Sequence, residues 1–359
     1  MNDLRRRGFH RILIIKPSSL GDVIHALPVL HGLRTRWPRA GISWLVAESC
    51  AGLLEGHSEL DEVIRFDRRR YGLIGRNLRV TVEFGEFVQG LRVRAFDLVI
   101  DLQGLFRSAF LAFAAGAPER LGFPDAREFA SMFYTRRVPV RGRDPHAVDR
   151  NYAFAQLLGF EDVPIRFEIP VAPAADARVA GWLAEGGIEP GQPFALLGPA
   201  TRWETKQWPA GFFAEVARGI WRHYGWPVVL AGTPSEVPVA REVASRAEAV
   251  VNLAGRTSVQ ELVALVARSG LVVMNDSGPM HIAAAMGKPL VALYGPTNPL
   301  RTGPYRRPEA VLRHDLPCSP CYFKRLAQCP HEHACLRRLE PREVLARVDQ
   351  LLAARVETA

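Results

Sequence analysis

Short, almost wholly apolar runs alternate with longer amphipathic stretches along the whole chain. The short runs predict β-strands, and the longer stretches, whose apolar positions recur at helical spacing, predict helices. Strands that are apolar on both faces are typical of parallel sheets covered by helices on each side. Strands are predicted at residues 11–16, 42–48, 63–66, 97–103, 194–198, 227–232, 250–254, 271–275 and 289–294, and helices at 23–36, 107–115, 210–224, 238–247, 258–269 and 280–286.

A stretch rich in proline and alanine, residues 163–177, separates the two halves of this pattern and lacks helical periodicity. Such a composition predicts a linker. We therefore predict two doubly wound α/β domains, residues 1–170 and 171–338, followed by a helix at 339–359. Sheets of this kind bind ligands at the carboxyl ends of their strands, which predicts a binding cleft between the domains.

Composition narrows the class of protein. A hydrophobic content of 48% and a charged content of 23% are typical of a soluble globular protein. No apolar run approaches the length of a membrane span, and the N-terminal apolar stretch is too short for a signal peptide, so we expect a cytoplasmic protein. The net charge of +9 favours an acidic partner. No recognised nucleic-acid-binding motif accompanies that charge, which disfavours nucleic acid.

The turn after the first predicted strand carries Lys16, Ser18, Ser19, Asp22 and His25 within ten residues. Ser18, Ser19 and Asp22 suit a helix start, where the helix dipole keeps a carboxylate ionised. One interpretation is an ordinary capping aspartate. The other is a general base directed into the cleft, with Lys16 and the two serines around an anionic ligand. Neither a G-x-G-x-x-G nor a P-loop pattern occurs here, which disfavours nicotinamide enzymes and P-loop kinases.

Polar loops also follow successive strands of the second half. The strand at 271–275 ends in Asp276, after which Ser277 and Gly278 begin a helix whose free N–H groups suit a pyrophosphate. His281 on that helix is either a packed helix residue or a ligand contact. Taken singly, each loop is compatible with an ordinary capped turn.

Three further loops complete this edge of the second predicted sheet. Thr201 and Lys206 in the loop after 194–198 are available to phosphate oxygens, and Glu236 after 227–232 is placed to bind ribose hydroxyls. Thr297 lies in a polar loop that follows 289–294. Four such loops in one domain predict a nucleotide site.

Several motifs together resemble the bacterial heptosyltransferases of glycosyltransferase family nine, closest to the heptosyltransferase I branch. They are KPSSLGDVIHALPVL (16–30), DLVIDLQGLFRSA (97–109), TRWETKQWP (201–209) and NDSGPMHIAAAMGKPLVALYGPTNP (275–299). The resemblance covers nearly the whole chain up to about Arg301. It implies a GT-B fold, with two Rossmann-like domains facing across a cleft and the terminal helix packing back on the N-terminal domain.

The resemblance also implies an activity. The family transfers L-glycero-D-manno-heptose from ADP-heptose to a Kdo or inner-core heptose acceptor of lipopolysaccharide, inverting the anomeric centre, with no cofactor or metal required. Asp22 and Lys206 are the catalytic candidates. The implied nucleotide-sugar residues are Thr201, Lys206, Glu236, Asp276, Ser277, Gly278, His281 and Thr297, and the implied acceptor residues are Lys16, Ser18, Ser19, Gln103, Arg68, Arg69, Arg70 and Arg120.

Arginines gather in the first half, at residues 65–79 and 120–143. A run of arginines is often only a solvated surface. Alternatively, these guanidiniums recognise the Kdo carboxylate and the lipid A phosphates of the acceptor. The same residues could hold the protein peripherally on the anionic cytoplasmic face of the inner membrane.

Four cysteines form a C-x2-C-x7-C-x5-C pattern at residues 318–335, a stretch called the Cys-rich segment below. A structural zinc site, loop thiols and disulfides all remain open for Cys318, Cys321, Cys329 and Cys335. This segment departs from the heptosyltransferase I pattern. Two other functions therefore stay open: a family-nine enzyme with another nucleotide sugar or acceptor, and a GT-B protein that binds nucleotide without turnover. The Asp22 and Lys206 loops disfavour the second.

Overall fold

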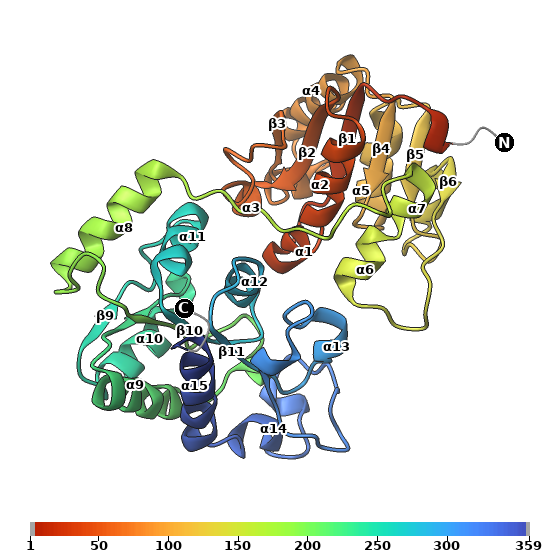
Figure 1. Cartoon of the computed structure of the whole chain (residues 1–359). Coiled ribbons are helices and arrows are strands. Elements are labelled where there is room, and N and C mark those ends of the chain that lie inside the picture. The colour runs from red at the N-terminus through yellow and green to blue at the C-terminus, as the bar shows by residue number, and fades with distance from the viewer. Residues whose placement is uncertain (1–3, 357–359) are drawn as a thin grey trace. The chain divides into compact units, whose positions relative to one another are not determined.

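The computed structural model describes residues 4–356 and divides into two compact units, Met1–Pro170 and Val171–Ala359. Each unit is built on its own six-stranded parallel sheet with helices around it (Figure 1). The inner strands are almost wholly buried and the edge strands are partly exposed, so each sheet forms the centre of a hydrophobic core. The α/β class predicted from the alternation of apolar runs is confirmed. Among residues 4–356, no helix has both the length and the apolar character needed to cross a membrane.

The first sheet has the strand order β3-β2-β1-β4-β5-β6. Its strands are β1 (Arg11–Ile15), β2 (Gly41–Ala47), β3 (Glu62–Phe66), β4 (Leu98–Asp101), β5 (Glu119–Gly122) and β6 (Arg136–Arg137). Its helices are α1 (Leu20–Ile24), α2 (Leu27–Arg36), α3 (Glu48–Ala51), α4 (Leu78–Val93), α5 (Phe106–Ala114), α6 (Ala147–Tyr152) and α7 (Phe154–Leu158), with 3-10 turns η1 (Leu4–Arg6), η2 (Arg70–Leu73) and η3 (Ala130–Phe133).

The second sheet repeats this topology, in the order β12-β11-β10-β7-β8-β9. Its strands are β7 (Ala195–Gly198), β8 (Val228–Leu230), β9 (Val250–Asn252), β10 (Leu271–Asn275), β11 (Leu290–Leu293) and β12 (Val311–Leu312). Its helices are α8 (Pro173–Glu185), α9 (Ala210–Tyr224), α10 (Val237–Ala244), α11 (Val259–Arg268), α12 (Gly278–Ala285), α13 (Pro299–Thr302), α14 (Ala334–Arg337) and α15 (Pro341–Val356), with 3-10 turns η4 (Glu204–Lys206), η5 (Pro234–Glu236), η6 (Pro308–Ala310) and η7 (Leu326–Gln328).

All strands are parallel, and in both sheets the order in which successive strands are added reverses beside the first strand. Ligands bind at such reversal points in doubly wound folds. In the first unit, β1 pairs with β4, so the loops that follow these two strands are neighbours. In the second unit, β7 pairs with β10 in the same way. The topology therefore brings together the loop after β1 and the loop after β4, and separately the loops after β7 and β10.

Three differences from the predicted elements have local causes. The predicted helix at 23–36 is divided into α1 and α2, and Pro28 lies in the first turn of α2, where a missing N–H is tolerated. Helix α8 begins at Pro173, so the linker is shorter than predicted. The strands β5, β6 and β12 were not predicted, because β5 and β6 contain charged side chains and β12 has only two residues, so none of them forms an apolar run.

The terminal helix α15 belongs to the second unit. Its packing on the first domain stays a prediction, and within its own unit the helix contacts α9 and β11 (Figure 1). Gly219 of α9 allows this close approach, since a Cβ there would lie 2.6 Å from a Leu345 side-chain carbon. Just before α15, the Leu339 carbonyl accepts a hydrogen bond from the buried Trp208 indole at 2.9 Å.

Candidate active site

Asp22 lies in the first turn of α1, directly after the loop that joins β1 to this helix. Ser19 precedes the helix with an extended backbone, and its N–H and hydroxyl donate to the Asp22 carboxylate at 2.8 and 2.7 Å. A carboxylate in this position caps the helix, and the helix dipole favours its negative charge. The capping role considered for Asp22 is therefore present, and its role as a base remains a prediction.

Lys16 supplies a positive charge to this loop. Its side chain is buried, and its ammonium donates to the Leu102 carbonyl oxygen at 2.9 Å. Burial raises the pKa of Asp22, but the charge of Lys16 and the hydrogen bonds from Ser19 outweigh it, so the pKa lies below its ordinary value. The carboxylate is therefore ionised at neutral pH and able to accept a proton. Burial lowers the pKa of Lys16, and the charges of Asp22 and Asp101 oppose that shift.

Asp101, at the end of β4, fixes the neighbouring loop and was not predicted as a site residue. It is fully buried and accepts hydrogen bonds from the Tyr134 hydroxyl at 2.7 Å and the Ser108 hydroxyl at 2.8 Å. The N–H groups of Gln103 and Gly104 donate to it at 2.8 and 3.2 Å. Burial raises the pKa of Asp101, and these four donors oppose the rise. The carboxylate that closes the apolar run DLVID is the sequence signal that could have identified it.

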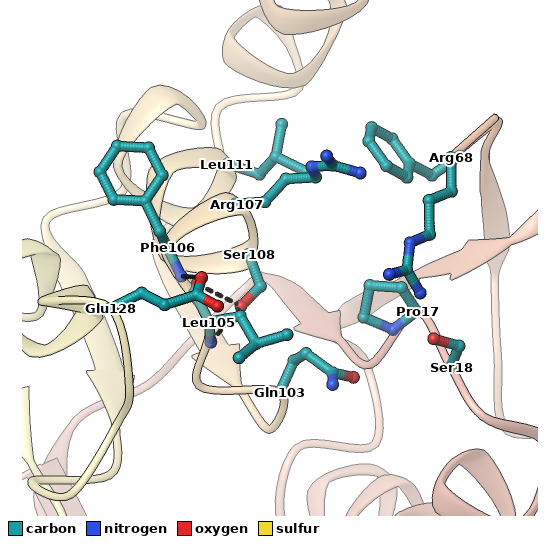
Figure 2. Close-up of a pocket in the computed structure, with 11 residues that line it drawn as sticks. Pro17, Ser18, Arg68, Gln103, Leu105, Phe106, Arg107, Ser108, Leu111 and Glu128 are labelled. Carbon is teal, nitrogen blue, oxygen red and sulfur yellow. Dashed lines mark hydrogen bonds between the residues drawn. The ribbon is translucent and has the colours of Figure 1, made fainter. Parts of the chain in front are cut away.

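A cavity of about 280 Å³ opens beside these two loops and is called the Arg68 pocket below (Figure 2). It brings Ser18, Arg68 and Gln103, three of the predicted acceptor residues, into one wall. The Gln103 side-chain oxygen is buried there without a hydrogen-bond partner among the described residues, so it can accept from a ligand. The full lining is Pro17, Ser18, Phe66, Arg68, Gln103, Leu105, Phe106, Arg107, Ser108, Leu111 and Glu128.

The guanidinium groups of the first unit differ in their hydrogen-bond and ion-pair partners. Within residues 4–356, neither Arg68 nor Arg107 has an acidic partner. In contrast, Arg70 binds both oxygens of Glu83, at 2.8 and 2.5 Å. Arg120 donates to the carbonyl oxygens of Phe133 and Ala117, at 2.9 and 2.6 Å. The predicted acceptor residues Arg70 and Arg120 therefore have structural partners, and Arg69 is exposed outside the lining of the pocket.

In the second unit, Lys206, Asp276 and Thr297 meet. The Lys206 ammonium lies 2.6 Å from an Asp276 carboxylate oxygen, and the Thr297 hydroxyl donates to the same oxygen at 2.6 Å. The three residues come from the loops after β7, β10 and β11, called below the Lys206 loop (199–209), the Asp276 turn and the Thr297 loop (294–298). All three side chains are largely buried. The hydroxyl of Thr297 helps to fix Asp276, and the ammonium of Lys206 keeps further N–H donors that suit the oxygens of a phosphate group.

The remaining predicted donor residues lie around this cluster. Thr201 is buried in the Lys206 loop, and its carbonyl accepts from the Gln207 side chain at 2.7 Å. Ser277 precedes α12 with an extended backbone, and Gly278 is the first helical residue. Asn275, which we did not predict, ties the Asp276 turn to the Lys206 loop by accepting from the Trp208 N–H at 3.0 Å and donating to the Pro199 carbonyl at 3.0 Å.

Glu236 and two histidines have structural roles in their own elements. The Glu236 carboxylate accepts from the Thr233 N–H at 2.7 Å and so closes its own turn after β8. His281 is buried in α12. His25 is buried at the end of α1, where its ring packs edge-on against His146 with the ring centres 5.3 Å apart.

The four cysteines of the Cys-rich segment are free thiols that line a second cavity of about 280 Å³, together with His331. Among the residues that the structure describes, no three His, Cys, Asp or Glu side chains are close enough to hold a metal ion. A zinc site at Cys318, Cys321, Cys329 and Cys335 stays a prediction. Burial, followed by the other three cysteines, raises the pKa of Cys335 to about 11, so its thiol is protonated at neutral pH.

The chain is similar to known proteins over most of its length. A family model described as Glycosyltransferase family 9 (heptosyltransferase) matches residues 84–332. Lipopolysaccharide heptosyltransferase 1 of Pseudomonas aeruginosa is 35% identical, over 96% of this chain and 98% of its own length. The protein of the same description from Escherichia coli K12 is 30% identical, over 84% and 93%.

Solved structures agree in fold. A family 9 glycosyltransferase from Veillonella parvula superposes with a TM-score of 0.82 at 24% identity, covering 97% of this chain and 98% of that one. Escherichia coli heptosyltransferase WaaC with ADP superposes with a TM-score of 0.75 at 27% identity, covering 95% and 99%. These similarities confirm the GT-B class that the resemblance implied. The chain therefore belongs to glycosyltransferase family 9 and is a glycosyltransferase of the lipopolysaccharide heptosyltransferase type.

Proposed function

We propose that this protein transfers heptose from ADP-L-glycero-D-manno-heptose to a Kdo residue, or to an inner-core heptose, of nascent lipopolysaccharide. The reaction inverts the anomeric carbon and proceeds without a metal ion. The cluster of Lys206, Asp276 and Thr297 carries the proposal, because it holds a cation in a fixed position where three loops converge. The WaaC structures described with ADP and with ADP-2-deoxy-2-fluoro heptose, both 27% identical to this chain, support an ADP-heptose donor.

Asp22 is the proposed base. The acceptor hydroxyl attacks C1 of the heptose as the bond to ADP breaks, through a transition state with oxocarbenium character like that of glycoside hydrolysis. An ionised carboxylate is a weak base, so Asp22 takes the proton late, as the new bond acidifies the hydroxyl. Lys16 and Ser19 keep the carboxylate ionised for this step.

Lys206 is the proposed partner of the departing ADP. Negative charge grows on the diphosphate as the glycosidic bond breaks, and a cation already held in place stabilises that charge. Asp276 fixes the ammonium, and the start of α12 at Ser277 and Gly278 adds backbone donors. We assign Thr201, Thr297 and His281 to the same donor site and Glu236 to the ribose.

The acceptor is assigned to the Arg68 pocket. Arg68 offers a guanidinium without an acidic partner in the described chain, and Gln103 and Ser18 offer polar groups beside it. The Kdo carboxylate suits the Arg68 fork. Because Glu83 holds Arg70 and backbone carbonyls hold Arg120, we place the carboxylate at Arg68 and not at those two residues. Arg107 faces the same cavity and is added to the proposed acceptor residues (Figure 2).

We also propose peripheral attachment to an anionic membrane surface. Leu73, Ile74, Leu78 and Val82 are exposed apolar side chains around η2 and the start of α4, and Arg68, Arg69, Arg76 and Arg79 lie in the same stretch. Apolar side chains flanked by cations are typical of surfaces that dock on anionic lipid.

An ADP-release assay over a panel of nucleotide sugars, with and without a Kdo-bearing acceptor, tests the proposal. We expect release to require ADP-heptose and the acceptor together. Asp22→Ala should lower kcat by about 100- to 10,000-fold, while calorimetry finds ADP affinity unchanged. Near-native turnover by Asp22→Ala would refute the base assignment. Turnover of another sugar would favour the alternative family-nine enzyme, and ADP binding without turnover of any sugar would favour a non-catalytic binding protein.

A further inference from the structure

The Cys-rich segment binds the Lys206 loop directly. The Thr205 hydroxyl donates to the Phe323 carbonyl oxygen, and the His333 ring lies with Nε2 2.7 Å from the Thr205 carbonyl oxygen. The Leu326 N–H donates to the Glu204 carboxylate at 2.9 Å. Three separate points of this segment therefore hold the two residues that precede Lys206.

The contact of His333 with Thr205 is buried and has a defined direction. Both side chains are almost inaccessible, at 5% and 2% exposure. A carbonyl oxygen only accepts, so Nε2 must carry the hydrogen. The hydrogen bond from Nε2 fixes the orientation of the Thr205 carbonyl. It therefore also fixes the peptide bond between Thr205 and Lys206.

The same segment also braces the Thr297 loop. The Ser319 hydroxyl donates to the Gly295 carbonyl at 2.5 Å, and the Tyr322 N–H donates to the Pro296 carbonyl at 2.8 Å. Gly295 permits this approach, because a Cβ there would lie 2.8 Å from a Leu336 side-chain carbon. Two of the three loops that form the cluster of Lys206, Asp276 and Thr297 are thus fixed by one segment.

A shared aromatic ring strengthens the connection. The Lys206 ammonium lies 4.6 Å from the centre of the Trp203 ring, and the Lys324 ammonium of the Cys-rich segment lies 5.1 Å from it. Both distances are within the range in which a cation is attracted to an aromatic face. The Cys-rich segment is therefore connected to Lys206 in two ways, through the backbone of the Lys206 loop and through the Trp203 ring that both ammonium groups contact.

We propose that the Cys-rich segment positions Lys206, with His333 as the positioning residue that acts through the Thr205 carbonyl. This inference rests on the proposed function only where it names the diphosphate of the donor as the group that Lys206 binds. His333 does not touch the donor, and its effect on the reaction passes through the Lys206 loop.

The first arm compares His333→Ala with His333→Gln. The Gln amide can donate from nearly the place of Nε2, and both variants share the left-handed backbone of this position, with φ of 60°, so that backbone effect cancels in the comparison. We expect His333→Ala to weaken ADP binding by calorimetry, and to raise the donor KM, by about 5- to 30-fold. His333→Gln should recover most of the loss. His331→Ala, at an exposed residue of the same segment, should match the native protein.

The second arm needs no ligand and uses the scarcity of lysine, which occurs only at positions 16, 206, 288 and 324. Lys16 is buried, and Lys288 is held by the Ala267 and Ser269 carbonyls, so cleavage by a lysine-specific protease reports chiefly on the other two sites. We expect His333→Ala to accelerate cleavage after Lys206 by about 5- to 30-fold, and His333→Gln to restore the native rate.

Each outcome decides between defined alternatives. Unchanged cleavage and unchanged ADP affinity in His333→Ala would overturn the proposal. Equal losses in His333→Gln and His333→Ala would show that packing, and not the hydrogen bond, is responsible, and would also overturn it. Faster cleavage with unchanged ADP affinity would show that the loop is held as inferred but that Lys206 does not bind the diphosphate, so that the proposed function fails at this point.

Discussion

At the scale of single residues, two opposing effects determine the protonation state of the Asp22 carboxylate. Burial favours the protonated acid, which could not accept a proton from a hydroxyl. The charge of Lys16 and the two hydrogen bonds from Ser19 act in the other direction and prevail. Lys16 is itself buried, and its position is fixed by the Leu102 carbonyl at the end of the neighbouring strand. The ionised state of Asp22 therefore depends indirectly on the Leu102 carbonyl, which follows the neighbouring strand β4.

Replacing Lys16 by Met tests this dependence. Asp22 must be ionised to take a proton, so activity falls as the pH drops through its pKa. Removing the neighbouring cation raises that pKa, and we expect the acid limb of kcat/KM to move to higher pH. Lys288→Met, which removes a lysine held by carbonyls in the second unit, is the matched control and should leave the limb in place. An acid limb shared by Lys16→Met and the native protein would contradict the assignment.

The acceptor assignment makes a second prediction at this scale. Arg68→Met should raise the acceptor KM by about 10-fold or more, because a charge-assisted hydrogen bond contributes roughly 1.5–3 kcal/mol. Steady-state kinetics on a Kdo-bearing acceptor measures it. Arg70→Met is the control, since Glu83 already occupies that guanidinium and the acceptor KM should not change. Equal effects of the two substitutions would show that the arginines act as a diffuse charge and not through the pocket.

At the scale of elements, the groups of the candidate site lie where strands end and helices begin, and this part was predictable from sequence. Apolar runs that end in polar, glycine-bearing loops indicated the loops of Asp22, Lys206 and Asp276. What could not be predicted depends on contacts between distant positions. One of the donors to Asp101 is the distant Tyr134, and the His333 ring contacts a carbonyl 128 residues away. No local pattern encodes such pairs, because they form only when separate elements pack.

Gly122 in β5 illustrates such a contact and gives the third prediction. A Cβ at this position would lie 2.2 to 2.5 Å from the Tyr134 ring, so Gly122→Ala must displace the ring whose hydroxyl binds Asp101. We expect the free energy of unfolding to fall by about 1–3 kcal/mol, with a higher acceptor KM and unchanged ADP affinity. Urea denaturation and calorimetry measure these effects.

Gly85→Ala is the control for that experiment. It lies inside α4 with no atom within 4 Å of its added Cβ, so it should stabilise the protein by about 0.5–1 kcal/mol. A destabilisation by Gly85→Ala as large as that by Gly122→Ala would contradict the explanation from the Tyr134 contact.

At the scale of the whole molecule, the two units share one strand order but offer different chemistry at their strand ends. The first carries a buried carboxylate, a buried lysine and a cavity with two arginines. The second carries an ammonium and a hydroxyl fixed on one carboxylate, with a helix start beside them. In the function that we propose, equivalent positions of the same topology thus serve proton transfer and acceptor binding in one unit, and donor binding in the other.

The net charge of +9 and the exposed apolar side chains of the first unit make the last prediction. Leu78 is 83% exposed at the start of α4, among arginines that attract anionic lipid. Leu78→Glu removes an apolar group that can enter the interface and adds a charge of the membrane's sign. We expect sedimentation with vesicles rich in anionic lipid to show binding weakened by about tenfold or more.

Leu300→Glu, at a residue 78% exposed in the second unit, makes the same chemical change elsewhere and should bind as the native protein does. Because the attraction is electrostatic, native binding should fall as salt rises and be weak on neutral vesicles. Binding that ignores salt, or that both substitutions weaken alike, would place the membrane contact outside η2 and α4.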